Sequence, residues 1–229
     1  MEPERAIQPW RKMSHAMGRA WPQVPDRPNR IAFRNSGRRT PVHPGVSLRL
    51  LSPFSRQDLI RVVVETPRGS RHKYELLPEF EAFALSKTLP EGMTFPYDFG
   101  FVPQTRGEDG DPLDALVLFS EPTFPGCIIE CRLIGVIRAS QKEKKRGWIR
   151  NDRYLTIAES TEEFAGIRKS RQLPASILVE LERFFKNYND LEERRFRLHG
   201  IDGPDAARRL LRAGCLVEGA IDGPGDSPP

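Results

Sequence analysis

The sequence predicts an α+β fold that is mainly β, a small antiparallel barrel followed by C-terminal helices. Between residues 59 and 158, short segments that are β-branched or alternate in polarity are separated by turns containing Gly or Pro. Short strands at this spacing are typical of a barrel. Beyond Pro174 the pattern changes to apolar residues at helical spacing. The folded part is therefore expected to begin with strands and to end with helices.

Five segments are expected to form strands. The first contains Val62, Val63 and Val64, whose branched side chains suit a pleated sheet. The second alternates polar and apolar residues, and the third is apolar enough to be buried. The fourth forms either one long strand or two short ones. The predicted strands are residues 59–65, 73–76, 114–119, 127–137 and 153–158.

Two helices are predicted after the strands. Pro174 suits the first turn of a helix, where the missing N–H has no partner to lose. Apolar residues then recur on one helical face from Ile177 to Tyr188. A second, shorter helix is expected over residues 204–212. Both helices are expected to cover the core of the barrel.

The net charge of +5 is unevenly distributed along the 229 residues. Residues 1–50 hold ten Lys and Arg, three Asp and Glu and seven prolines, a balance of +7, so the remainder carries −2. We expect a basic, Pro-rich, disordered arm over residues 1–54, a folded domain over 55–217 and a flexible tail over 218–229. Such an arm is either a solvated tail or a contact for nucleic acid or anionic lipid.

Composition excludes some classes of protein. No run of about 18 apolar residues exists, so no transmembrane helix is predicted. The first residues lack the apolar core of a secretory signal. The three cysteines are odd in number and form no CxxC pair, which favours reduced thiols and a cytoplasmic location.

The most informative segment is the acidic loop at residues 108–114, which places Asp109, Asp111 and Asp114 within six positions. Carboxylates this dense repel one another unless a cation neutralises them, and hard oxygen ligands select Mg²⁺, Mn²⁺ or Ca²⁺. An EF-hand is excluded, because position 6 counted from Asp109 is not Gly and position 12 is Ser120. The loop leads into a buried strand, which favours a fixed metal site over a solvated acidic turn.

The segment Asp109–Ala115, DGDPLDA, resembles the DxDPxD signature of soluble family I inorganic pyrophosphatases. The resemblance runs from about Val62 to Gly214, and further motifs occur in the same order as in the family. These are Val62–Pro67, Lys73–Glu75, Met93–Pro103, Gly135–Val136, Asn151–Arg153 and Phe185–Leu191.

The resemblance implies a five-stranded, OB-like barrel flanked by helices that hydrolyses pyrophosphate to two phosphates with several Mg²⁺ ions, or with Mn²⁺. It also implies a homo-oligomer, often a hexamer. Asp111 would be the general base for the attacking water. By the same resemblance, the metal ligands would be Asp109, Asp114, Asp152 and Glu65, and the substrate-binding residues would be Lys73, Glu75, Lys87 and Tyr188.

The sequence departs from the family pattern in the phosphate clamp and the outer metal site. The acidic ligand expected shortly before Asp152 is missing near Gln141, and Lys87 stands at an arginine position. Phe99, Tyr154 and Asn189 replace a tyrosine and two lysines of the pattern. The missing cation could be supplied from a shifted position by Lys142, Lys144, Lys145 or Arg153. These departures leave two alternatives to a normal pyrophosphatase: a noncatalytic module that binds phosphate ligands or a partner, and an enzyme for a larger diphosphate or polyphosphate.

Overall fold

The computed structural model describes residues 47–55, 58–143, 146–191 and 194–216. Most of the predicted arm and the whole predicted tail lie outside these residues, and so do Lys144 and Lys145. The last part of the predicted arm has structure, however. Leu48–Leu50 form the 3₁₀ turn η1, and Phe54 makes a β-bridge to Ile60.

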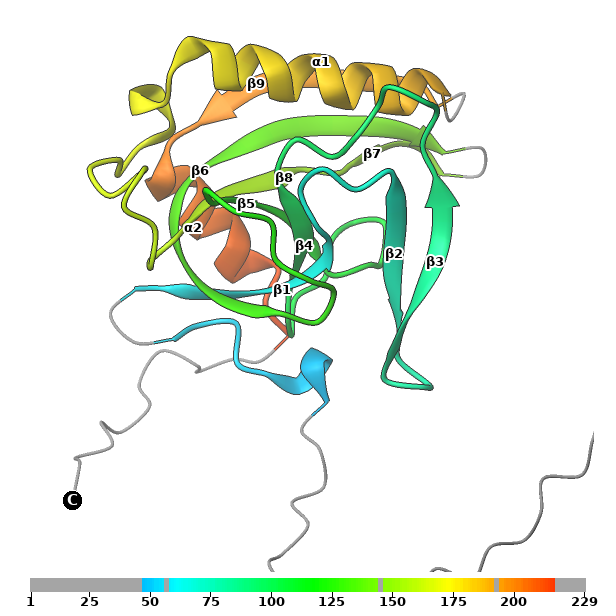
Figure 1. Cartoon of the computed structure of the whole chain (residues 1–229), viewed down its shortest axis with the longest axis horizontal. Coiled ribbons are helices and arrows are strands. Elements are labelled where there is room, and N and C mark those ends of the chain that lie inside the picture. Colours follow the sequence, from blue (N-terminus) through cyan, green and yellow to red (C-terminus); the bar gives the residue numbers. More distant parts are fainter. Residues whose placement is uncertain (1–46, 56–57, 144–145, 192–193, 217–229) are drawn as a thin grey trace, which may run out of the picture. The chain divides into compact units, whose positions relative to one another are not determined.

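The described chain contains nine strands and two α-helices (Figure 1). The strands are β1 (Ile60–Thr66), β2 (His72–Leu77), β3 (Ala82–Thr88), β4 (Asp98–Val102), β5 (Leu113–Leu118), β6 (Ile128–Glu143), β7 (Gly147–Arg150), β8 (Arg153–Ala158) and β9 (Phe196–Asp202). The helices are α1 (Ala175–Leu191) and α2 (Pro204–Ala213), with the 3₁₀ turn η2 (Ser170–Gln172) before α1.

Five of these strands close into a ring. They pair in the order β1, β4, β5, β8 and β6, and β6 pairs with β1 to complete the circuit. Four of the five pairings are antiparallel, whereas β5 and β8 run parallel, so the sheet is mixed. The predicted fold class, mainly β with a five-stranded ring and C-terminal helices, is confirmed, with the parallel pairing as an addition.

The long strand β6 closes the ring because it serves two sets of neighbours. Its first part pairs with β1, its middle with β8, and its second part with β7 and β9. Register shifts at Leu133/Gly135 and Arg138/Ala139 bend it, as bulges do in closed sheets. Of the two alternatives predicted for this segment, one long strand or two short ones, the structure shows one long strand, which continues to Glu143.

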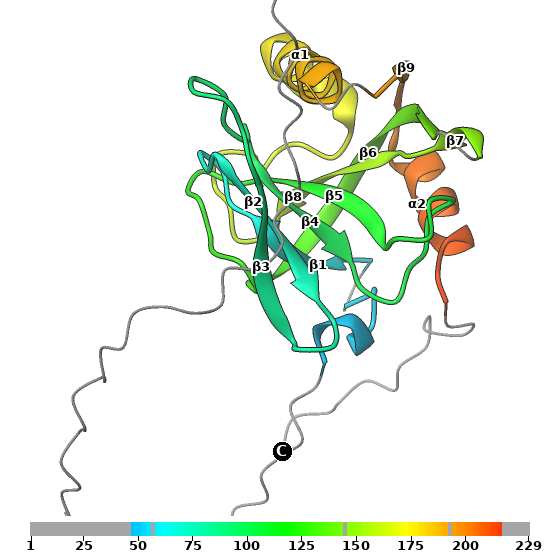
Figure 2. The same cartoon turned by 90° about the vertical axis from the view of Figure 1, so that its right-hand side faces the viewer.

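Alternate side chains of the ring enter two apolar cores. On β5, Ala115 and Val117 join a core shared with α2, while Leu116 and Leu118 join a core shared with α1. Figure 2 shows α1 end-on beside the sheet, with α2 on a different side. Both predicted helices therefore cover the barrel as expected. Neither helix, within the part of the chain described, is long and apolar enough to cross a membrane.

The β2–β3 hairpin stands apart as a separate two-stranded sheet (Figure 1). Its strands pair from His72 opposite Thr88 to Leu77 opposite Ala82, with a register shift between Lys73 and Tyr74. The amide of Tyr74 donates to the Thr66 side chain, which ties the hairpin to the end of β1. The hairpin thus forms a fixed wall beside the ring.

Candidate active site

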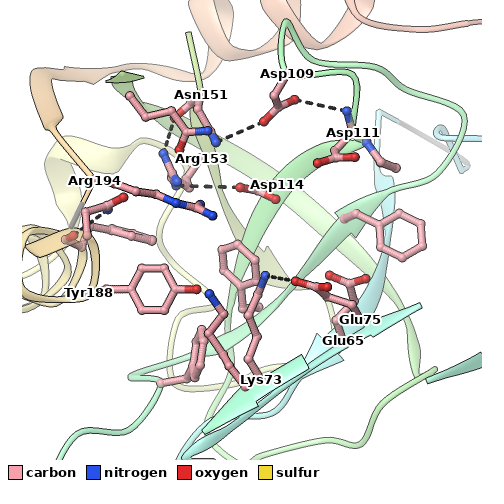
Figure 3. A pocket seen from close by; sticks show the side chains of 18 of the residues that line it. Glu65, Lys73, Glu75, Asp109, Asp111, Asp114, Asn151, Arg153, Tyr188 and Arg194 are labelled. Carbon is pink, nitrogen blue, oxygen red and sulfur yellow. Dashed lines mark hydrogen bonds and ion pairs between the residues drawn. The ribbon is translucent and has the colours of Figure 1, made fainter. Parts of the chain in front are cut away.

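A cleft with a volume of about 1010 Å³ lies between the β2–β3 hairpin, the acidic loop, the start of β8 and the end of α1. Eight of the nine predicted site residues line it, and the exception is Asp152. Figure 3 shows side chains from all these elements pointing into the same space. Segments far apart in the sequence therefore meet at one site.

All the carboxylates that line the cleft lie on one wall. This carboxylate wall is formed by β1, β2 and the loop that leads into β5. Its members are Glu65, Glu75, Asp109, Asp111 and Asp114. Lys73 lies within this wall, beside Glu75 on β2, whereas the other cations and the amides that line the cleft come from other elements.

Backbone hydrogen bonds hold the acidic loop in shape. The amide of Gly107 donates to the carbonyl of Asp111 at 2.7 Å, which closes a tight turn around Gly110. Gly110 has φ of +99°, a conformation that favours glycine. The amide of Asp111 donates to Asp109 Oδ1 at 3.2 Å. Asp109 is thereby fixed, whereas the side chain of Asp111 is exposed at the mouth of the cleft.

Asp114 lies deepest in the carboxylate wall, at the start of β5. Its nearest cation is Arg153, whose Nε lies 3.8 Å from Asp114 Oδ2. Burial raises the pKa of Asp114 to about 6, although Arg153 and Lys73 favour the charged form. Burial also raises the pKa of Asp109, to which the charge of Asp111 adds. The raised pKa values mean that the nearby cations of the protein do not fully offset the cost of burying these two carboxylates.

Glu65 and Glu75 form the other part of the wall and differ in their ionisation. Burial raises the pKa of Glu65 to about 7, and the hydrogen bond from the Leu76 amide offsets this only in part. Burial would also raise the pKa of Glu75, but Lys73 donates to it at 2.5 Å and holds the pKa below its ordinary value. Lys73 and Glu75 share one strand face, as their spacing of two residues requires.

The start of β8 shows which residues of the segment 151–154 face the cleft. Asn151 and Arg153 line the cleft, whereas Asp152 and Tyr154 point away from it. Tyr154 is fully buried in the core shared with α2. Neighbouring residues of an extended strand alternate between faces, so only one pair can reach the site.

The carboxylate of Asp152 is hydrogen-bonded and ion-paired to other residues of the protein, outside the cleft. Its carboxylate accepts from Arg150 Nε at 2.6 Å and from the amide of Ala139 at 3.0 Å, and Arg138 Nε lies 3.1 Å away. Its side chain is 4% exposed. The structure therefore does not bring Asp152 to the other predicted metal ligands, and its role as a ligand stays a prediction.

Arg153 is a buried cation that lines the cleft. Its guanidinium lies 5.0 Å from the ring centroid of Phe185 and 5.4 Å from that of Phe196. Its side chain is 6% exposed. This packing holds the guanidinium rigidly beside Asp114. Of the four residues predicted as substitutes for the missing cation, Lys142 and Arg153 line the cleft.

The end of α1 contributes the opposite side of the cleft. Tyr188 stacks on Phe184 with ring centroids 5.9 Å apart, and Lys87 Nζ lies 5.5 Å from the Tyr188 ring. Asn189 is buried and donates to the carbonyl of Phe185 at 2.8 Å. Its own carbonyl accepts the amide of Arg194, which also lines the cleft (Figure 3).

Sequence reasoning missed Asn151 and Arg194 as cleft residues. The alternation of β8 could have indicated Asn151, because Arg153 and Asn151 share a strand face. No pattern in the sequence pointed to Arg194, whose place depends on the turn that follows α1.

The carboxylate wall suits a hard divalent cation, because carboxylates offer oxygen ligands. Several of these carboxylates also have too little positive charge nearby to offset their burial. Among the described residues, no group of three or more Asp, Glu, His or Cys side chains already converges closely enough to hold an ion. Asp109 shows one reason: Oδ1 accepts from its own loop and Oδ2 accepts from Asn151 Nδ2 at 3.1 Å. The residues fit such an ion by the chemistry of their donor atoms.

Comparisons with known proteins agree with this geometry. The family model described as inorganic pyrophosphatase matches residues 62–216. An inorganic pyrophosphatase of Nostoc sp. is 35% identical over 153 residues, which covers 67% of this chain and 88% of that protein. One of Methanosarcina acetivorans is 38% identical over 151 residues, covering 66% of this chain and 87% of that protein. The crystal structure of inorganic pyrophosphatase from Thermus thermophilus superposes with a TM-score of 0.68 and 30% identity, covering 75% of this chain and 97% of that one.

Proposed function

Because the chain belongs to the inorganic pyrophosphatase family, we propose that it hydrolyses pyrophosphate to two phosphates in the cleft described above, with Mg²⁺ or Mn²⁺. The observation that carries this proposal is that the carboxylate wall and the donors Lys73, Lys87, Arg153 and Tyr188 line one cleft. Pyrophosphate concentrates negative charge on a small molecule, so it needs both cations from the protein and cations held by carboxylates.

We assign the metal ligands to Asp109, Asp114 and Glu65. A divalent cation bound there would neutralise phosphate oxygens and lower the pKa of a water molecule toward neutrality. Asp111 lies beside these residues and is exposed to the cleft, so it can accept the proton of the attacking water. The water oxygen forms a bond to one phosphorus, the bridging P–O bond breaks, and the second phosphate leaves.

The cations that line the cleft hold the substrate oxygens. Arg153 is held by Phe185, Phe196 and the Asn151 carbonyl, and its guanidinium brings positive charge to the phosphate. Lys73 and Lys87 add point charges, and the Tyr188 hydroxyl adds a neutral donor. Glu75 holds Lys73 in place through its 2.5 Å hydrogen bond.

The full-length protein should release phosphate from pyrophosphate when Mg²⁺ is present and should lose this activity when EDTA removes divalent cations. Colorimetric phosphate release at matched protein concentration measures both conditions. Restoring Mg²⁺ in excess of EDTA should recover the rate, which separates metal removal from unfolding. Absence of release from folded, Mg²⁺-supplied protein would contradict the proposal, and calorimetric binding of pyrophosphate without turnover would then favour a noncatalytic module.

The stability of the metal-free protein should fall as pH rises from about 4.5 to about 7. The pKa of Glu65 is raised from 4.5 to about 7, so the folded protein binds more protons than the unfolded chain throughout this window. The full shift corresponds to roughly 3 kcal/mol of unfolding free energy lost by neutral pH. Denaturant unfolding in EDTA across this window measures the effect.

Glu65→Gln is the control for this pH dependence, because its amide oxygen can still accept from Leu76 but cannot ionise. The variant should lose most of the slope and keep a smaller one from Asp114, whose pKa is raised to about 6. A slope unchanged in Glu65→Gln would show that another group is responsible.

A cytoplasmic location and a homo-oligomeric state belong to the same proposal. The three cysteines form no disulfide in the structure, and a reducing compartment would keep them as thiols. Light scattering on the purified full-length chain measures the oligomeric state directly.

A further inference from the structure

The two sides of the cleft differ in the metal ligands that they offer. Its carboxylates all belong to the carboxylate wall, while β6, β8 and the connection between them contribute amides and cations instead. We call this second surface the amide–arginine wall. Its members are Gln141, Lys142, Arg146, Asn151 and Arg153. Among the described lining residues, this wall offers no carboxylate to a metal ion.

Asn151 is the residue of this wall that contacts the acidic loop directly. Its Nδ2 donates to Asp109 Oδ2 at 3.1 Å, and the Asp111 amide donates to Asp109 Oδ1 (Figure 3). Both oxygens of Asp109 thus have a neutral protein donor. A carboxylate at position 151 would instead place two negative charges about one hydrogen-bond length apart, which only a proton or a cation could stabilise.

Arg153 likewise stabilises the carboxylate of Asp114 without a metal ion. Its guanidinium is buried against two aromatic rings and lies 3.8 Å from Asp114 Oδ2. Asp109 therefore contacts the amide of Asn151, just before β8, and Asp114 lies beside the guanidinium of Arg153, at the start of β8.

We propose that Asn151 lowers the number of divalent cations that this cleft binds, or their affinity. With aspartate at position 151, the same cleft would bind at least one more ion, or would bind ions more tightly. The amide satisfies Asp109 where a metal ion would otherwise be required, and Arg153 supplies positive charge to phosphate from the same wall. The inference rests on the proposed function for the premise that divalent cations enter this cleft.

The test is a Mn²⁺ titration of the full-length protein and of Asn151→Asp, followed by electron paramagnetic resonance of free Mn²⁺ without pyrophosphate. The substitution changes no side-chain size. We expect Asn151→Asp to bind one more Mn²⁺ per chain, or to bind with a dissociation constant about tenfold lower, because affinity at oxygen sites follows the number of charged ligands. An unchanged number of ions and an unchanged dissociation constant would overturn the proposal.

Asp152→Asn is the matched control, because it makes the opposite change at the adjacent residue, outside the cleft. The family resemblance implies that Asp152 is a metal ligand, but its carboxylate is bound by Arg138 and Arg150, so we expect Mn²⁺ binding to stay as in the unmodified protein. Loss of an ion in Asp152→Asn would overturn the assignment of Asn151 as the residue that faces the metal. If Asp152→Asn does not fold, the titration of Asn151→Asp alone still decides.

The readout is independent of turnover. A protein that releases no phosphate but gains Mn²⁺ in Asn151→Asp would refute the proposed function and leave the role of Asn151 standing. An active protein whose Mn²⁺ binding is unaffected by Asn151→Asp would refute only the role of Asn151.

Discussion

Asp111→Asn should slow the release of phosphate from pyrophosphate by roughly 10²- to 10⁴-fold, the range expected when a general base is removed. Asparagine keeps the size and polarity of the side chain but cannot accept a proton from water. The side chain of Asp111 is exposed at the mouth of the cleft, and the loop is held by backbone hydrogen bonds that the substitution does not touch. The loss should therefore appear in kcat, with little change in unfolding temperature.

Glu108→Gln is the matched control for this experiment. It makes the same chemical change in the same loop, at an exposed residue that does not line the cleft. Glu108 Oε2 accepts from the amide of Arg150 at 2.9 Å, and a glutamine oxygen can accept the same bond. Steady-state rates of the two variants should differ by at least about a hundredfold. Equal rates would show that Asp111 is not the base.

The strands that sequence patterns predicted are those whose side chains enter a core. The run Val62–Val64 and the segment that became β5 are buried, so their apolar composition reveals them. Strand β4 was missed, because Gly100 at its centre is unfavourable in a strand. The structure explains this glycine: a Cβ there would lie 2.0 Å from the carbonyl oxygen of Val63 in β1. Strands β1 and β4 lie so close together here that only glycine fits at position 100, and this closeness cannot be read from the sequence.

Outside the ring, β2 was predicted, but β3, β7 and β9 were missed for a different reason. The hairpin partner β3 and the late strand β9 have no fully buried residue, so neither carries a continuous apolar signal. Gly200 within β9, at φ of +128°, interrupts the pattern further. Their place depends on partners distant in the sequence, since β9 pairs with the second part of β6.

The same distinction applies to the candidate site. The acidic loop is a local feature, and its three aspartates could be predicted from spacing alone. The segment 151–154 required a choice of register, and a motif match selected Asp152 and Tyr154. The structure places Asn151 and Arg153 in the cleft, because Asp114 on β5 lies opposite Arg153 in the parallel pairing with β8. That pairing is a long-range fact, so residue identity alone could not decide which face of β8 meets the site.

Replacing Arg153 by methionine should lower kcat/KM for pyrophosphate by roughly 100-fold or more. Methionine keeps the unbranched, apolar inner part of the side chain but removes the guanidinium, with its charge, its donors and its contacts with Phe185 and Phe196. Each lost hydrogen bond between charged groups costs on the order of 1.5–3 kcal/mol, which is about 10- to 100-fold in rate when expressed fully in the transition state. The kcat/KM of Arg153→Lys should lie between those of the unmodified protein and of Arg153→Met, because lysine keeps the charge but not the planar guanidinium.

Arg150→Met controls for the removal of an arginine near β8. Arg150 pairs with Asp152 outside the cleft, where Arg138 remains as a second partner, so its loss should leave kcat/KM within about threefold of the unmodified protein. If Arg153→Met behaves like Arg150→Met, Arg153 does not contact substrate, and its burial beside Asp114 would be structural. If instead only Arg153→Met is impaired, the cation expected from the family pattern is supplied by this guanidinium, on the strand face that also carries Asn151.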